Sequence, residues 1–307
     1  MTSTRQARER RRTLDGTYHP SLGKRIRWRL SDWTYRHGWA AELAHRVGLQ
    51  RGVAVRQHTF ELPRAAGKPT LRMVFASDFH AGPLTHPALI DEACRAIAAA
   101  APDLLLLGGD FVYRRARDVD VLAQRLGALA PPLGTFGVIG NHDTLGDQRH
   151  IVARLERAGV TMLVNRNVQL PAPHDDVWVC GLDDPVFGVP DAVAALEGAT
   201  GTRLLLMHAP DGLLALEGHR FDLALCGHTH GGQVALPFGI PIVLPKGRLS
   251  RRYSAGEYAL PQRDARLLVS RGIGCSGVPV RLFAQPEVHV CALLPAARTG
   301  VVGQDAA

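Results

Sequence analysis

The 307-residue chain lacks the long hydrophobic run that a membrane-spanning helix needs, since no stretch of 18 or more residues is both apolar and uncharged. It also lacks the apolar core of a secretory signal peptide: Arg10, Arg11 and Arg12 supply charge near the amino terminus, but no apolar stretch follows them. With 46% hydrophobic residues, the chain is too apolar to be disordered. We therefore expect a globular protein of the cytoplasm, either soluble or peripheral on the inner face of the membrane.

Cysteine is scarce, and its five positions form no C-x-x-C pair. The odd number and wide spacing predict neither a disulfide framework nor a thiolate zinc site. We expect buried, small hydrophobic residues at these positions. The cysteines are Cys94, Cys180, Cys226, Cys275 and Cys291.

Acidic residues are scarce in the first quarter of the chain. Residues 1–72 contain 16 Lys and Arg against 5 Asp and Glu, a net charge of +11, whereas the whole chain carries +8. Residues 73–307 are therefore mildly acidic, because 20 basic residues there face 23 acidic ones. A separate basic segment indicates an anionic partner, either a membrane surface or a nucleic acid. No feature indicates a protein partner.

Residues 1–70 are expected to form a basic arm, disordered over residues 1–20, with an amphipathic helix over about residues 21–49. Three of the four tryptophans lie in this helical segment, and a basic helix with tryptophans is typical of a membrane interface. Gly23 and Gly38 interrupt the apolar stripe, and Arg29 falls close to it. A helix that packs on the rest of the protein, with its arginines in solvent, is the alternative. The stripe consists of Leu22, Ile26, Leu30, Trp33, Ala40, Leu43 and Val47.

After Pro69, short apolar runs alternate with helical segments, which predicts a sheet with parallel strands and helices on its faces. From Gly232 onward, short β-rich segments indicate an antiparallel second half. We expect one domain over residues 71–295 and a flexible tail over 296–307. The expected helices are Ala88–Ala100, Val119–Ala130 and Gln148–Ala158, and the first expected strands are Leu71–Ala76, Leu104–Leu107, Phe136–Ile139, Val160–Val164, Val177–Cys180, Leu204–Met207 and Leu223–Cys226.

Polar residues that can bind metals follow five of these apolar runs. In open α/β sheets, ligands bind outside the carboxyl ends of the strands, so these residues should meet at one rim. Each motif alone is weak, because a Gly-Asp pair is ordinary turn chemistry and a lone histidine is usually structural. Together they predict a metal site. The residues are Asp78 and His80, Asp110, Asn141 with His142 and Asp143, His208, and His228 with His230.

These motifs, in this order, resemble the signature of the calcineurin-like metallophosphoesterases over about residues 71–295. The segment 227–233, GHTHGGQ, and the later Arg271–Gly274 and Pro279–Arg281 are similar to a bacterial branch with YkuE- and YaeI-like proteins. That branch is associated with phosphodiesters of the membrane or cell envelope, including UDP-2,3-diacylglucosamine hydrolysis in lipid A biosynthesis. The resemblance implies an α/β fold, a four-layer α/β/β/α sandwich of two mixed sheets flanked by helices.

The resemblance also implies two divalent metal ions per chain. Asp78, His80 and His230 would hold the first ion, Asn141, His208 and His228 would hold the second, and Asp110 would bridge them. Oxygen and imidazole ligands without thiolate suit manganese, iron or zinc. Two such ions can lower the pKa of water from about 15.7 to near 7, which makes hydroxide available at neutral pH.

His142 is the expected general acid, and Asp143 is expected to orient it by accepting its second N–H. Arg271 and Arg281 are expected to bind the substrate phosphate. Both arginines could instead be solvated or pair with Glu257 or Glu287.

We therefore expect a dimetal phosphoesterase that hydrolyses a phosphodiester or pyrophosphate bond by in-line attack of a metal-bound hydroxide. Its substrate would include a membrane lipid or a UDP-sugar lipid. A nucleotide or nucleic-acid phosphodiesterase, drawn to its substrate by the basic arm, is the first alternative. A metal-binding scaffold without catalysis is the second.

Overall fold

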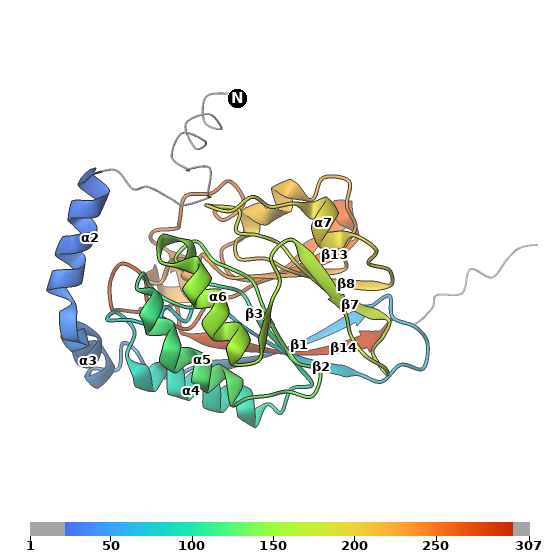
Figure 1. The fold of residues 1–307 in the computed structure, drawn as a ribbon, viewed down its shortest axis with the longest axis horizontal. Helices are drawn as coiled ribbons and strands as arrows, with labels where there is room; N and C mark the ends of the chain where they lie inside the picture. Colours follow the sequence, from blue (N-terminus) through green and yellow to red (C-terminus); the bar gives the residue numbers. More distant parts are fainter. Residues whose placement is uncertain (1–21, 297–307) are drawn as a thin grey trace, which may run out of the picture.

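The computed structural model describes residues 22–296, in which two six-stranded mixed sheets stack face to face (Figure 1). The expected disorder of residues 1–20 and the expected tail beyond residue 296 lie outside the described residues. In spatial order, the first sheet contains β1 (Ala54–Leu62), β14 (Glu287–Pro295), β2 (Leu71–Ala76), β3 (Leu104–Leu107), β4 (Thr135–Gly137) and β5 (Val160–Met162). The second contains β12 (Gly256–Leu260), β13 (Ala265–Val269), β9 (Leu223–Cys226), β8 (Thr202–Leu206), β7 (Val177–Gly181) and β6 (Arg166–Gln169).

Alternating side chains of the strands build the layers. On β2, Phe75 packs between the two sheets, whereas Val74 packs under the outer helices. The helices α4 (Pro87–Ala99), α5 (Val119–Gly127) and α6 (Gln148–Arg157) cover the first sheet, and α7 (Ala192–Leu196) packs on the second. The expected four-layer sandwich is confirmed. All five cysteines are free, and four of them are buried.

Strand β1 corrects the expected boundary between arm and body. It pairs in parallel with β14 from Ala54 opposite Glu287 to Leu62 opposite Pro295, so part of the expected arm is an edge strand of the first sheet. Only Phe60 and Leu62 are buried, while the rest of the strand is partly or fully exposed. One face of an edge strand is exposed to solvent and can carry charged residues. The sequence of β1 therefore lacks the alternation of apolar and polar residues that predicts a strand.

The expected amphipathic helix is two helices, α2 (Leu22–Thr34) and α3 (Trp39–Arg46), separated by the 3₁₀ turn η1 (Arg36–Gly38). The chain bends there because His37 and Gly38 have positive φ values of 66° and 68°. Figure 1 shows α2 beside the body rather than within it. No helix among residues 22–296 is long and apolar enough to span a bilayer.

One residue of the apolar stripe, Ala40, packs on the body. Helix α3 turns Ala40, Ala41 and Ala44 inward, and these are its buried residues. The large residues of the stripe are exposed: Leu22, Ile26, Leu30, Trp33, Leu43 and Val47. Helix α3 therefore packs on the body, as in the alternative, while the large apolar residues of both helices stay exposed.

Candidate metal centre

The polar turns at the carboxyl ends of β2, β3 and β9 share an unusual backbone. Asp78, His80, Asp110, His228 and His230 all have positive φ, between 44° and 71°. For residues other than glycine this conformation is uncommon and costs roughly 1–3 kcal/mol each. Such strain persists only where the surroundings determine the structure strongly, and it gathers at functional sites.

Hydrogen bonds and close packing hold the two carboxylates in place. Both oxygens of Asp78 accept a bond from the backbone N–H of His228 at 3.1 Å, and Asp110 Oδ1 accepts one from the backbone N–H of His142 at 2.7 Å. A Cβ atom at Gly227 would lie 2.0 Å from Asp78 Oδ2, and one at Gly140 would lie 2.2 Å from Asp110 Oδ1. Only glycine fits at these two positions.

Three side chains form the first group of candidate ligands. His80 Nε2 lies 3.0 Å from His230 Nε2, and Asp78 Oδ1 lies 3.5 Å from His230 Nε2 and 3.8 Å from His80 Nε2. All three residues are buried.

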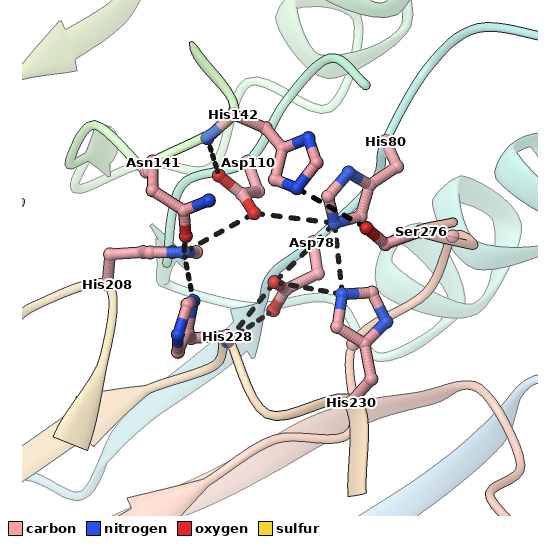
Figure 2. A network of polar contacts seen from close by, with 12 residues as sticks. Asp78, His80, Asp110, Asn141, His142, His208, His228, His230 and Ser276 are labelled. Carbon is pink, nitrogen blue, oxygen red and sulfur yellow. Dashed lines mark hydrogen bonds and ion pairs between the residues drawn. The ribbon is translucent and has the colours of Figure 1, made fainter. Parts of the chain in front are cut away.

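The second group lies beside the first, and Asp110 lies between them (Figure 2). His208 Nε2 is 3.0 Å from Asn141 Oδ1 and 3.2 Å from His228 Nδ1. Asp110 Oδ2 is 3.3 Å from His208 Nε2 and 3.4 Å from His80 Nε2. The structure thus brings together all seven side chains that the sequence suggested as ligands.

This donor set fits two divalent cations. The ligand atoms of Asp78, His80 and His230 lie within 4.8 Å of one another, as do those of Asp110, His208 and His228. Carboxylate, imidazole and amide groups are ligands of manganese, iron and zinc. One carboxylate oxygen common to both groups would allow two ions to lie close together.

The electrostatics favour neutral imidazoles in most of this set. Burial lowers the pKa of His80 and His230 well below the usual value, and burial together with His208 lowers the pKa of His228 to about 3. One ring nitrogen of each is therefore unprotonated at neutral pH and can bind a cation. Burial also opposes charge on His208, but the Asp110 carboxylate outweighs it and raises the pKa of His208.

His142 lies against the candidate ligands and faces the cavity. Its Nδ1–H donates to the backbone carbonyl of Tyr113 at 2.6 Å, and its Nε2 lies 3.3 Å from Ser276 Oγ. Its ring meets that of His80 edge to face, with centroids 4.7 Å apart. The nitrogen that can exchange a proton with a ligand is therefore Nε2.

Asp143 does not orient His142 as the sequence analysis expected. Its buried carboxylate accepts backbone N–H groups from Asp110 at 2.9 Å, Gly140 at 3.0 Å and Val112 at 3.1 Å. The Tyr113 carbonyl orients His142 instead. Asp143 therefore joins the turns that follow β3 and β4, and a backbone partner such as Tyr113 leaves no signal in the sequence.

The two arginines do not line the cavity. Arg281 is buried and donates to the backbone carbonyls of Gly274, Ala284 and Arg271, and its Nη2 lies 3.1 Å from His230 Nδ1. Arg271 forms an ion pair with Glu287 at 2.8 Å, one of the alternatives left open above. Both guanidinium groups have partners within the protein, and their contact with a substrate phosphate stays a prediction.

A cavity of about 580 Å³ opens at the candidate ligands. Ser276, Gln233 and Thr229 line it, and the sequence analysis did not single them out. Gln233 fixes the loop that carries Ser276: its Nε2 donates to the carbonyls of Ser276 and Val278, and its Oε1 accepts from the Ser276 N–H. Gln233 stands inside the GHTHGGQ segment, which was the available signal.

Comparisons with known proteins identify the family of this chain. Residues 71–232 match the family model described as calcineurin-like phosphoesterase. The chain is 33% identical over 228 residues to Phosphodiesterase YaeI of Escherichia coli, covering 73% of this chain and 82% of that protein. It is 32% identical to the uncharacterized metallophosphoesterase YkuE of Bacillus subtilis, covering 62% of this chain and 68% of that protein.

Among solved structures, a 5′-nucleotidase precursor from Thermus thermophilus matches with a TM-score of 0.41 and 17% identity. The match covers 66% of this chain and about half, 49%, of that chain.

Proposed function

This chain belongs to the calcineurin-like phosphoesterase family, and from this premise we propose that it hydrolyses phosphodiester or pyrophosphate bonds with the help of two divalent metal ions. The observation that carries the proposal is the position of Asp110 Oδ2, 3.3 Å from His208 Nε2 in one group and 3.4 Å from His80 Nε2 in the other. Such an arrangement suits a bridging carboxylate.

Asp78, His80 and His230 would hold one ion, Asn141, His208 and His228 the other, and Asp110 both. Manganese, iron and zinc all suit these ligands. When bound, the ions supply Lewis acidity to the phosphoryl oxygens and lower the pKa of water.

Residues of the chain would position the substrate phosphate and supply the proton. The Tyr113 carbonyl accepts a hydrogen bond from Nδ1–H of His142, so that Nε2 of the imidazolium form would donate a hydrogen bond or proton to an oxygen of the substrate phosphate. Ser276 Oγ lies beside that nitrogen and would align it. Asp143 accepts hydrogen bonds from the backbone N–H groups of Asp110 and Gly140. These bonds hold the turns that carry Asp110 and His142 in a fixed position relative to each other.

The amino-terminal helices support an anionic membrane surface as partner. Their exposed face carries large apolar residues, among them Leu30 and Trp33, and Arg27, Arg29 and Arg36 are exposed on the same segment. Apolar residues together with arginines are the composition of an interfacial helix. A phosphodiester of a membrane lipid or a UDP-sugar lipid is the substrate that this placement favours.

The second candidate substrate is a nucleotide or nucleic acid. The net charge of +11 over residues 1–72 is the observation in its favour, since phosphate backbones attract such segments. A scaffold without turnover is the remaining alternative.

A substrate screen with added Mn²⁺ tests these proposals. The panel is bis-p-nitrophenyl phosphate, p-nitrophenyl phosphate, UDP-sugars with and without acyl chains, and single-stranded DNA. We expect turnover of the diester above that of the monoester, and turnover of acylated UDP-sugars above their unacylated forms. Preference for DNA would favour the second candidate, and no turnover of any substrate would favour the scaffold.

A further inference from the structure

The loop after β7 carries a buried carboxylate that does not belong to the candidate ligand set. Asp184 is 0% exposed, and its Oδ2 accepts the N–H of Phe187 at 2.6 Å. Its Oδ1 is buried as well and has no hydrogen-bond partner within the described residues 22–296. An aspartate is almost never fully buried without a partner, because an unpaired charge away from water is costly. The free oxygen therefore points to a ligand that the protein binds.

The sheet topology places Asp184 near His208. Strands β7 and β8 pair in parallel up to Gly181 opposite Leu206, and the Leu182 N–H then donates to the Leu206 carbonyl at 2.9 Å. Asp184 follows closely after the end of β7, and His208 follows closely after the end of β8. Both residues therefore leave neighbouring strands at the same edge of the second sheet, which is the edge where the candidate ligands gather.

The charges of Asp184 and His208 influence each other. Burial raises the pKa of Asp184 to about 6, and the charge of His208 acts in the opposite direction. Burial likewise opposes the charge on His208, but the carboxylates of Asp110, Asp78 and Asp184 raise the pKa of that histidine. Asp184 is therefore mostly ionised at neutral pH, and its charge acts on the group of candidate ligands that contains His208.

The loop that carries Asp184 is fixed by hydrogen bonds of its own. The Asp183 carboxylate accepts the N–H groups of Asp184 and Val189 at 2.8 and 2.7 Å. The Asn165 side chain accepts the Asp183 N–H at 2.9 Å and donates to the Val189 carbonyl at 2.8 Å. A Cβ atom at Gly188 would lie 2.3 Å from the Asp184 carbonyl oxygen, so the loop closes tightly on itself. These contacts hold Asp184 in place before any ion arrives.

We infer that Asp184 is a positioning residue for the ion that Asn141, His208 and His228 would hold. Its Oδ1 accepts a hydrogen bond from a water molecule in the shell of that ion, and its negative charge adds to the attraction for the cation. It acts through water, because no group of three ligand atoms within 4.8 Å of one another in residues 22–296 includes Asp184. The inference rests on the proposed function, since it requires that ion.

The variant Asp184→Asn tests the inference through the affinity for Mn²⁺. Its amide keeps one oxygen for the Phe187 N–H, but it presents to the water an NH₂ group, which donates hydrogen bonds and cannot accept them. In calorimetric titrations of the metal-stripped protein, the dissociation constant of one Mn²⁺ ion should rise roughly 10–100-fold, while that of the other changes little. The melting temperature of the metal-free variant should equal or exceed that of the wild type, because an unpaired buried charge has been removed.

The matched control is Asp191→Asn, which removes an exposed carboxylate from the same segment and keeps an oxygen for the Ala194 N–H. Both of its Mn²⁺ dissociation constants should equal those of the wild type. An unchanged affinity in Asp184→Asn would overturn the inference and leave the dimetal centre intact. A loss of both ions together with a lower melting temperature would also overturn it, because Asp184 would then have a structural role. A wild-type protein that binds no Mn²⁺ would instead overturn the metal centre of the proposed function.

Discussion

The ligand-bearing turns and the amino-terminal helices are built in opposite ways. The turns are buried and strained, and hydrogen bonds from neighbouring turns hold each carboxylate, as the backbone of His228 holds Asp78. The helices expose their large apolar residues and meet the body through the three buried alanines of α3 and through polar contacts such as Asp32 with Arg114 at 2.7 Å. The comparison teaches that contacts within the protein fix the conformation of the ligand-bearing turns, whereas the large apolar residues of the helices are left exposed to an external partner.

The largest effect should come from the centre of the turns. Replacing Asp110 by Asn removes the one carboxylate common to both groups, so its negative charge can no longer offset the repulsion of two cations. Turnover of bis-p-nitrophenyl phosphate should fall by roughly 10³-fold or more, and metal content should fall with it. Elemental analysis and steady-state kinetics check this. A variant with wild-type metal content and turnover would show that Asp110 does not bridge.

A smaller effect is expected from His142→Asn. The metal content should stay at the wild-type level, because His142 is not one of the seven candidate ligands, while turnover should fall roughly 10²–10⁴-fold. The loss should shrink for diesters with good leaving groups, which need little protonation. Equal losses over leaving groups of widely different pKa would instead point to a role in phosphate binding or structure.

Deleting helix α2 should change stability and turnover much less than the substitutions at the candidate metal centre change turnover. Deleting residues 1–37 removes α2 and its partly buried ion pair of Asp32 with Arg114, but it leaves α3 and β1 in place. The melting temperature should drop by no more than roughly 2–4 °C, and turnover of a soluble diester should stay within about twofold. Binding to anionic vesicles should weaken, and the part that is lost should be sensitive to salt.

A longer deletion is the matched comparison. Removing residues 1–60 also removes most of β1 and the buried Gln50, whose amide donates to the carbonyls of Leu84 and Pro279. The melting temperature should then drop sharply, and activity on every substrate should fall together. If the short deletion has the same effect as the long one, α2 is part of the body and the contrast between the two regions is wrong.

The smallest expected effect is on the stability of the protein at acidic pH, and it comes from His58 on β1, outside both regions. Burial, followed by the neighbouring His289, lowers the pKa of His58 to about 4; Glu257, Glu287 and Arg56 also face this group. The unfolded chain, with a histidine pKa of about 6.5, takes up the proton first, so stability is full above pH 6.5 and falls as the pH drops toward 4. His58→Gln should flatten the dependence of melting temperature on pH in this window. His219→Gln, in a loop after η4 (Pro210–Ala215), is the control and should leave it unchanged.

The sequence predicted the centre of the molecule better than its edges. The ligand motifs could be recognised because each follows an apolar run, and two of them include a glycine that a carboxylate approaches closely, Gly140 beside Asp110 and Gly227 beside Asp78. Strand β1 could not be recognised, because an edge strand with Arg56 and Glu61 exposed lacks a clear alternation. The break at His37 depends on a backbone conformation that histidine seldom adopts.

The roles of polar residues around the centre depended on tertiary partners. Asp143 stands next to His142 in the chain, yet its carboxylate accepts backbone groups from turns about 30 residues away. Arg281 is held by carbonyls of its own loop. Neighbours in the chain do not specify such contacts.

The most direct test of the central claim is a titration of the metal-stripped protein with Mn²⁺, followed by turnover of bis-p-nitrophenyl phosphate and by metal content per chain. If Asp110 joins two ion sites, activity should be absent without metal, rise with added Mn²⁺ and reach its plateau at two ions per chain. Full activity of the stripped protein, or a plateau at one bound ion, would contradict a dimetal centre.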